Sequence, residues 1–153
     1  MFQTLSDLDW KALEFGEVID SNTSHVVKYK HNQNIANVAQ STQELSKLVE
    51  SAIASESVPV ILGGDHSLSI GSVHGTLKSF NSNIGLIWID AHADINTPLT
   101  SGSGNLHGQP VSFLVDELID YMPKLNGFEW IQSRISVKNI VYIGLRDVDP
   151  GEQ

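Results

Sequence analysis

The apolar positions of the chain form one helical stripe followed by three short runs. From Leu45 onward, apolar residues recur every three or four positions, which is the spacing of an amphipathic helix that rests on a core. Ser41 or Thr42 is the expected N-cap, and Glu44 completes a capping box with Ser41. We expect this helix to end near Ser55. Its apolar positions are Leu45, Leu48, Val49, Ala52 and Ile53.

The three runs are rich in β-branched residues. They lack the alternation of apolar and polar residues that is typical of a strand with one solvent-exposed face, which predicts buried parallel strands. They cover Val58–Leu62, Ile84–Ile89 and Ile140–Leu145. Helices are expected between them, over Ser67–Phe80 and from Pro110 onward, because proline is well tolerated in the first turn. The order of elements predicts an α/β fold, with three α/β/α layers around a mostly parallel sheet.

The sheet predicted in this way is small. The first forty residues add only an irregular strand between Ala12 and Ile19, and Asp149–Gln153 directly follow a buried strand. We therefore expect residues 1–153 to form a single, incomplete α/β domain that is truncated at both ends.

Composition narrows the possible partners and the compartment. The net charge is −9 and no stripe of lysine or arginine is present, so neither nucleic acid nor a membrane is an expected partner. The chain has no cysteine, which excludes disulfides and thiolate metal sites and favours a reducing compartment. Met1–Trp10 contains no arginine, unlike a mitochondrial presequence. We expect a cytoplasmic protein, with mitochondria as the alternative if a leader sequence is missing.

Polar residues follow each predicted strand, where ligands bind in open parallel sheets. Residues two apart in an extended segment point the same way, so Asp90, His92 and Asp94 are expected to converge. His66, beside two glycines after the first run, can reach the same cluster. Imidazole and carboxylate together suit divalent manganese, iron, cobalt or zinc. The alternative is a polar loop whose spacing is accidental.

Two further residues have competing interpretations. Asp65 either caps the helix that follows or accepts a hydrogen bond behind the metal ligands, and both are favoured over direct ligation. His107 lies in a loop of small residues and can carry protons because the pKa of imidazole is near neutrality; the alternative is a solvated side chain. The remaining histidines are assigned to structure or surface: His25, His31 and His74.

Four motifs together resemble the arginases of the ureohydrolase superfamily. They are Gly63–Leu68, Asp90–Thr97, Ser103–Pro110 and Gly144–Glu152, within a resemblance that runs from about Val58 to Gln153. Agmatinases and formimidoylglutamases have similar metal motifs, whereas the stretch from Asn96 through Pro110 resembles arginase proper. The resemblance implies hydrolysis of L-arginine to L-ornithine and urea, as in arginine metabolism and the urea cycle.

The resemblance also implies roles for individual residues. Two Mn²⁺ ions are expected, one held by His66, Asp90 and Asp94 and the other by Asp90 and His92, with Asp90 bridging them. His107 is the implied proton shuttle. The implied substrate-binding residues are Asn96 and Ser103 at the α-carboxylate, Asp149 near the α-amino group and Glu152 in the amino-acid pocket, with Asp147 an acidic neighbour of less defined role. Assembly into a homo-oligomer, a trimer or hexamer, is implied as well.

The chain also departs from the arginase pattern. That pattern includes a later strand ending in Asp-x-Asp and a later glutamate, and the 153 residues contain neither, which leaves four visible ligands for two ions. Three interpretations stay open: part of an active arginase, an inactive truncated isoform or remnant that binds metal weakly, or an unrelated metallohydrolase. An agmatinase-type ureohydrolase is a further alternative. From the 153 residues alone we expect little or no urea release.

Overall fold

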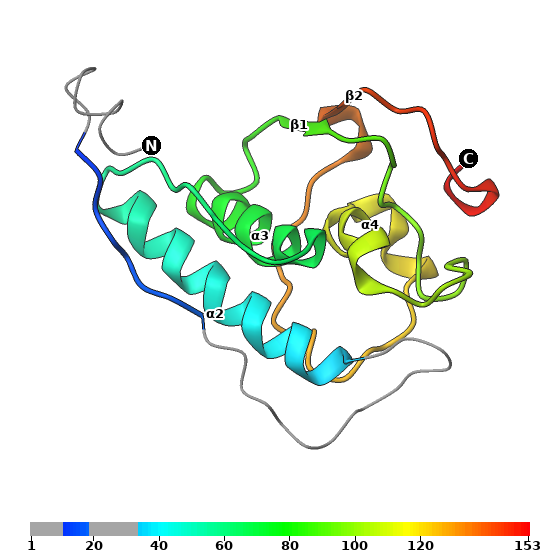
Figure 1. Ribbon diagram of the computed structural model, residues 1–153, viewed down its shortest axis with the longest axis horizontal. Coiled ribbons are helices and arrows are strands. Elements are labelled where there is room, and N and C mark those ends of the chain that lie inside the picture. Colours follow the sequence, from blue (N-terminus) through cyan, green and yellow to red (C-terminus); the bar gives the residue numbers. More distant parts are fainter. Residues whose placement is uncertain (1–10, 19–33) are drawn as a thin grey trace.

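The computed structural model describes residues 11–18 and 34–153, so the predictions for His25 and His31 lie outside the described residues. Its helices and strands are α2 (Ile35–Ala54), α3 (Ser69–Ser79), β1 (Leu86–Ile89), α4 (Pro110–Leu114) and β2 (Ile140–Ile143) (Figure 1). Short 3-10 turns occupy His66–Leu68, Leu106–Gly108, Asp116–Tyr121, Val137–Asn139 and Pro150–Glu152. None of the described helices is both long and apolar enough to cross a membrane.

Helices α2 and α3 lie along each other and form the largest helical contact (Figure 1). Two glycines of α3 make this close approach possible. A Cβ atom added at Gly71 would lie 2.3 Å from the carbonyl oxygen of Thr42, and one added at Gly75 would lie 2.5 Å from that of Ser46. The small residues of α3 therefore set the distance between the helices.

Helix α2 begins earlier than predicted. Ile35 and Ala39 are each only 2% exposed and continue the buried stripe by two turns toward the N-terminus. The N-cap is Asn34, so the predicted caps, Ser41 and Thr42, lie inside the helix and the capping box with Glu44 is wrong. The hydroxyl of Thr42 instead donates to the carbonyl oxygen of Val38, within the same helix.

Strands β1 and β2 are parallel neighbours, as predicted, and are shorter than the apolar runs that contain them. The register pairs Leu86 with Ile140 and Trp88 with Tyr142. The amide of Asp90 also donates to the carbonyl oxygen of Ile143, 3.1 Å away. This hydrogen bond extends the pairing of β1 with β2 to Asp90, the first residue of the polar motif that follows β1.

The prediction of a strand over Val58–Leu62 is wrong. The described structure has no regular secondary structure there, and Val58, Val60 and Leu62 are 66%, 67% and 76% exposed. A strand forms only where a neighbour satisfies its backbone donors and acceptors, and no strand pairs with this segment in the described part of the chain. Residues 12–18 likewise form no strand, while Ile19 lies outside the described residues.

One face of the small sheet is covered and the other is exposed. The main core joins α2, α3 and α4, and a smaller cluster of Trp88, Val111 and Val115 lies next to it. The alternate positions of both strands face outward: Ile87, Ile89, Val141 and Ile143. The predicted α/β class is confirmed, but the described helices cover one face of the sheet rather than both.

Candidate metal centre

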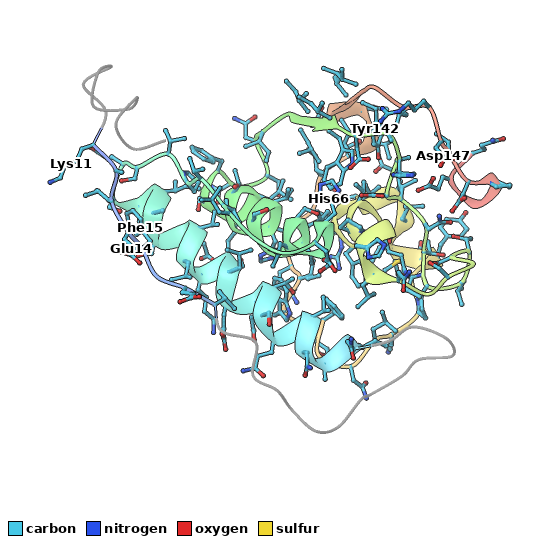
Figure 2. The ribbon with its side chains drawn as sticks, viewed as in Figure 1. Lys11, Glu14, Phe15, His66, Tyr142 and Asp147 are labelled. Carbon is cyan, nitrogen blue, oxygen red and sulfur yellow. The ribbon has the colours of Figure 1, made fainter. Side chains whose placement is uncertain are left out.

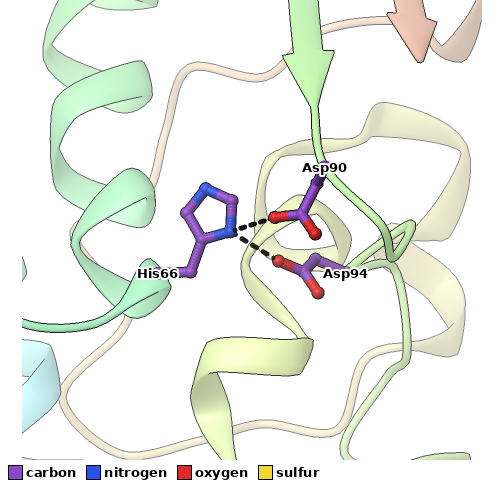
Figure 3. A group of neighbouring side chains, drawn as sticks. All are labelled: His66, Asp90 and Asp94. Atoms are coloured by element: carbon purple, nitrogen blue, oxygen red, sulfur yellow. Dashed lines mark ion pairs between the residues drawn. The ribbon is translucent and has the colours of Figure 1, made fainter. Parts of the chain in front are cut away.

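Three predicted metal ligands meet beside the carboxyl end of β1 (Figure 3). The Nδ1 atom of His66 lies 3.0 Å from Oδ2 of Asp90 and 2.8 Å from Oδ2 of Asp94. One nitrogen or oxygen atom from each residue falls within a group whose members are all within 4.8 Å of one another. An imidazole and two carboxylates so close together form a donor set suited to a divalent cation.

Asp90 presents its two oxygens in different directions. Oδ2 faces His66, whereas Oδ1 accepts from the backbone amide of His92 at 2.9 Å and lies 3.3 Å from Nδ1 of the His92 ring. Burial raises the pKa of Asp90, but the hydrogen bonds from His92 and the charge of His66 outweigh burial and leave the pKa below its ordinary value. Asp90 is thus the carboxylate that contacts both histidines.

Asp94 is the most buried member of the cluster, at 5% exposure. Burial, reinforced by the negative charge of Asp90 and only partly offset by His66, raises its pKa above the ordinary value. Among the described residues, Asp94 forms an ion pair with His66. Two neighbouring carboxylates, one of them buried, are a charge arrangement that a bound cation would relieve.

The imidazole of His66 is also held by an aromatic neighbour. It stacks on Trp88, with ring centroids 4.4 Å apart and an interplanar angle of 23°. Trp88 belongs to β1 and is 3% exposed. The strand that leads into Asp90 therefore also supports the histidine that faces Asp90.

His92 lies on the outer side of the cluster and is not part of the compact three-residue group. Its Nε2 atom is 3.5 Å from Oδ2 of Asp147, which follows β2. Burial lowers the pKa of His92, but its contacts with Asp90 and Asp147 outweigh burial and raise the pKa above the ordinary value. Figure 2 shows Asp147 on the segment that leaves β2 toward the C-terminus.

Asp65 caps the turn that precedes α3, as one of the two predictions for it proposed. Its carboxylate accepts from the amide of Ser67 at 2.9 Å and from the hydroxyl of the same residue. His107 lies beside this cap, with Nδ1 3.8 Å from Oδ2 of Asp65. His74, assigned to structure, is buried against Ser46 of α2.

The residues predicted to bind the amino-acid end of a substrate are only partly brought together. The amide of Asn96 donates to Oδ2 of Asp149 at 3.0 Å. Both oxygens of Glu152 accept from backbone amides, Oε1 from Ile95 at 3.2 Å and Oε2 from Asp149 at 2.9 Å. Ser103 is exposed, and its hydroxyl oxygen accepts from the amide of Asn105.

Tyr142 is a site neighbour that the sequence did not reveal. Its hydroxyl donates to the carbonyl oxygen of Ala93 at 3.0 Å. Burial and the negative charges of Glu152 and Asp94 raise the pKa of Tyr142 to about 12. A hydroxyl on an otherwise apolar predicted strand was the available signal, but nothing in the spacing indicates its partner.

Comparison with known proteins shows the family of the chain. The sequence matches the family model described as the Arginase family over residues 3–153. The chain belongs to the arginase family. This membership confirms the resemblance carried by the motifs around His66, Asp90 and His107.

Relatives in the arginase family are similar over nearly the whole chain. Arginase-2, mitochondrial, from Bos taurus is 50% identical over 156 residues, covering 99% of this chain and 43% of that protein. Arginase-1 from Homo sapiens is 46% identical over 144 residues, covering 94% of this chain and 43% of that protein. The chain spans about half the length of the relatives it matches.

Solved arginase structures share the fold. The arginase of Bacillus caldovelox aligns with a TM-score of 0.82 and 29% identity, covering 98% of this chain and 50% of that chain. The Entamoeba histolytica arginase in complex with L-ornithine aligns with a TM-score of 0.75 and 30% identity, covering 89% of this chain and 45% of that chain. The helices and the parallel sheet of this arginase-family chain therefore belong to the α/β fold of those enzymes.

Proposed function

We propose that the protein is a manganese-dependent arginase that hydrolyses L-arginine to L-ornithine and urea. The observation that carries the proposal is the meeting of His66, Asp90 and Asp94, whose nitrogen and oxygen atoms lie within 4.8 Å of one another. Family membership supplies the reaction class. For the 153 residues themselves we propose metal binding, because they correspond to about half of a relative's length.

The donor set fits two ions that share one carboxylate. His66, Asp94 and Oδ2 of Asp90 would hold one ion, and Oδ1 of Asp90 with His92 would hold the other. Mixed imidazole and carboxylate ligation suits Mn²⁺, although the residues alone also admit other first-row metals. When bound, a metal pair lowers the pKa of a shared water and thereby supplies a nucleophile at neutral pH.

His107 is the proposed proton carrier. Its side chain is 53% exposed and lies beside the cap at Asp65, where solvent can exchange protons with the ring. The departing ornithine nitrogen must gain a proton when its bond to the guanidinium carbon breaks. An imidazole gives and regains a proton readily near pH 7, which suits His107 to this transfer.

The amino-acid end of the substrate is assigned to the segments after β1 and β2. Asp149 carries the negative charge that would attract the α-ammonium group, and its hydrogen bond with Asn96 holds both side chains together. Ser103 and Asn96 would donate to the α-carboxylate. Glu152 supports the pocket through the amides of Ile95 and Asp149.

The reaction is tested with a longer chain, in which these 153 residues are joined to a segment that contains Asp-x-Asp. Manganese-dependent urea release from L-arginine, with little release from agmatine, is the expected result. Preference for agmatine would favour an agmatinase-type enzyme. Metal binding without any turnover would favour the second candidate, an inactive relative.

The role of His107 has its own prediction. In that longer chain His107→Asn should slow turnover by about 10²- to 10⁴-fold, the usual contribution of a general acid or base, and leave the manganese content unchanged. Metal content measured on the same samples is the control. Loss of manganese in this variant would assign His107 to the metal ligands instead.

Compartment and assembly are proposed from composition and family. The absence of cysteine is compatible with the reducing cytoplasm, while a relative from Bos taurus carries the name mitochondrial. We propose a cytoplasmic homo-oligomer, a trimer or hexamer, that acts on a small molecule rather than on nucleic acid or a membrane.

A further inference from the structure

Asp94 adopts an unusual backbone conformation. Its φ angle is 49°, in the left-handed region that residues with a Cβ atom rarely occupy. Such a conformation persists where surrounding groups hold it in place. The conformation also sets the direction of the buried carboxylate, which lies 2.8 Å from Nδ1 of His66.

Three hydrogen bonds fix the peptide groups on either side of this residue. The carbonyl oxygen of Ala93 accepts from the hydroxyl of Tyr142 at 3.0 Å, and the carbonyl oxygen of Asp94 accepts from the amide of Val111 at 2.9 Å. The amide of Ile95 donates to Oε1 of Glu152 at 3.2 Å. The three partners come from β2, α4 and the turn Pro150–Glu152, so distant parts of the chain converge on one residue.

Tyr142 is one of these partners and also packs against the apolar core. Its ring packs against the cluster of Trp88, Val111 and Val115. It pairs in register with Trp88, and Trp88 stacks on His66. One packed group of side chains therefore contacts both His66 and the Asp94 turn. Figure 2 shows Tyr142 and His66 on the same side of the molecule.

We propose that Tyr142 is a positioning residue of the metal centre, whose hydroxyl holds the Ala93 peptide and so aims the Asp94 carboxylate at His66. This inference rests on the proposed metal-binding function and deepens it. Partners of metal ligands commonly change metal affinity by about 10- to 100-fold when they are removed. Tyr142 acts one step further back, through the backbone that carries the ligand.

Tyr142→Phe in the 153-residue chain tests the proposal, because it removes the hydroxyl and keeps the ring. Tyr121→Phe is the matched control, since Tyr121 is 67% exposed. Mn²⁺ affinity is measured by isothermal titration, and hydrogen exchange at the amides of Ile95 and Val111 is measured by NMR without metal. We expect Tyr142→Phe to weaken Mn²⁺ binding about tenfold and to speed exchange at both amides about tenfold.

The two measurements separate this inference from the proposed function. Unchanged exchange at both amides, or faster exchange together with unchanged Mn²⁺ affinity, overturns the positioning role. A role in general stability alone would speed exchange throughout α2 and α3 as well, and that pattern also contradicts the proposal. If the unmodified chain binds no Mn²⁺, the proposed function fails, while the exchange measurement still decides whether Tyr142 holds the Asp94 turn.

Discussion

Asp90 and Asp94 lie against the same histidine but differ in how folding affects their ionisation. The fold lowers the pKa of Asp90, so the ionised form stabilises the folded state above pH 3.8, its ordinary pKa, and that stability is lost as pH falls. The fold raises the pKa of Asp94, so its ionised form opposes folding at neutral pH. The ionised form of Asp90 therefore stabilises the metal-free fold, whereas the ionised form of Asp94 destabilises it and would be stabilised by a bound cation.

Opposite effects of two similar substitutions follow. Without metal, at pH 7, Asp94→Asn should raise the melting temperature because it removes a buried charge, and Asp90→Asn should lower it because it removes a charge stabilised by hydrogen bonds from His92 and by the charge of His66. Thermal denaturation in the presence of a chelator measures both. Shifts in the same direction would show that the two carboxylates do not differ in this way.

His74 gives the fold a sensitivity to acid. Its Nε2 atom accepts from the amide of Gln132 at 3.3 Å, and its Nδ1 atom lies 2.9 Å from the hydroxyl of Ser46. Burial lowers its pKa, with Lys78 and Arg134 acting in the same direction and Glu50 opposing them. Protonation would place an N–H group against the amide that now donates to Nε2.

The stability contributed by neutral His74 is fully present above its ordinary pKa of 6.5 and is lost as pH falls below that value toward the lowered pKa. The chain should therefore lose more free energy of unfolding between pH 7.5 and about 5 than His74→Gln does. Urea denaturation at several pH values measures the difference. Parallel pH profiles for the two proteins would contradict a buried neutral imidazole.

Individual site residues were predictable to different degrees. The prediction that Asp90 and Asp94 meet His66 is confirmed, but the extended geometry behind it is wrong, because Asp94 has a φ angle of 49° and His92 lies outside the compact group. The helix-capping preference correctly placed Asp65. The hydroxyl of Tyr142 was missed because its partner, the carbonyl of Ala93, is 49 positions away in the sequence. No local pattern encodes a contact of that kind.

The contact between α2 and α3 depends on glycine. Gly71→Ala would place a methyl group 2.3 Å from a backbone oxygen of α2, a contact that only separation of the helices can relieve. Overpacking typically costs about 1–3 kcal/mol, which exceeds the roughly 1 kcal/mol that alanine gains in helix propensity. The melting temperature should fall by several degrees.

Gly102→Ala is the control for this prediction, because an added Cβ there meets no atom within 4 Å. Circular dichroism follows the melting of both variants. If Gly71→Ala melts no lower than the control, then α2 and α3 are not packed as closely as the structure shows.

The elements were predictable where a local pattern decides them. β-Branched runs located β1 and β2, and proline marked the start of α4. The run at Val58–Leu62 is also rich in β-branched residues but forms no strand, because strand formation requires a partner that composition does not reveal. The start of α2 was missed because Ile35 and Ala39 are packed by tertiary contacts.

The molecule as a whole is an α/β unit with an open face. Ile87 and Val141 are 63% and 57% exposed on the side of the sheet that no described helix covers. The chain spans about half the length of its relatives. The metal cluster nevertheless joins residues from two separate segments, the turn before α3 and the loop after β1.

A cation that bridges these segments should stabilise the whole molecule, because a ligand that binds only the folded state raises the free energy of unfolding. The decisive measurement is Mn²⁺ binding to the 153-residue chain by isothermal titration, with Asp94→Asn as the test variant and the exposed Asp120→Asn as its control. The account predicts binding by the chain and by Asp120→Asn, and binding weakened at least about 100-fold in Asp94→Asn. Equal Mn²⁺ affinity in all three proteins, or no binding by any of them, would contradict it.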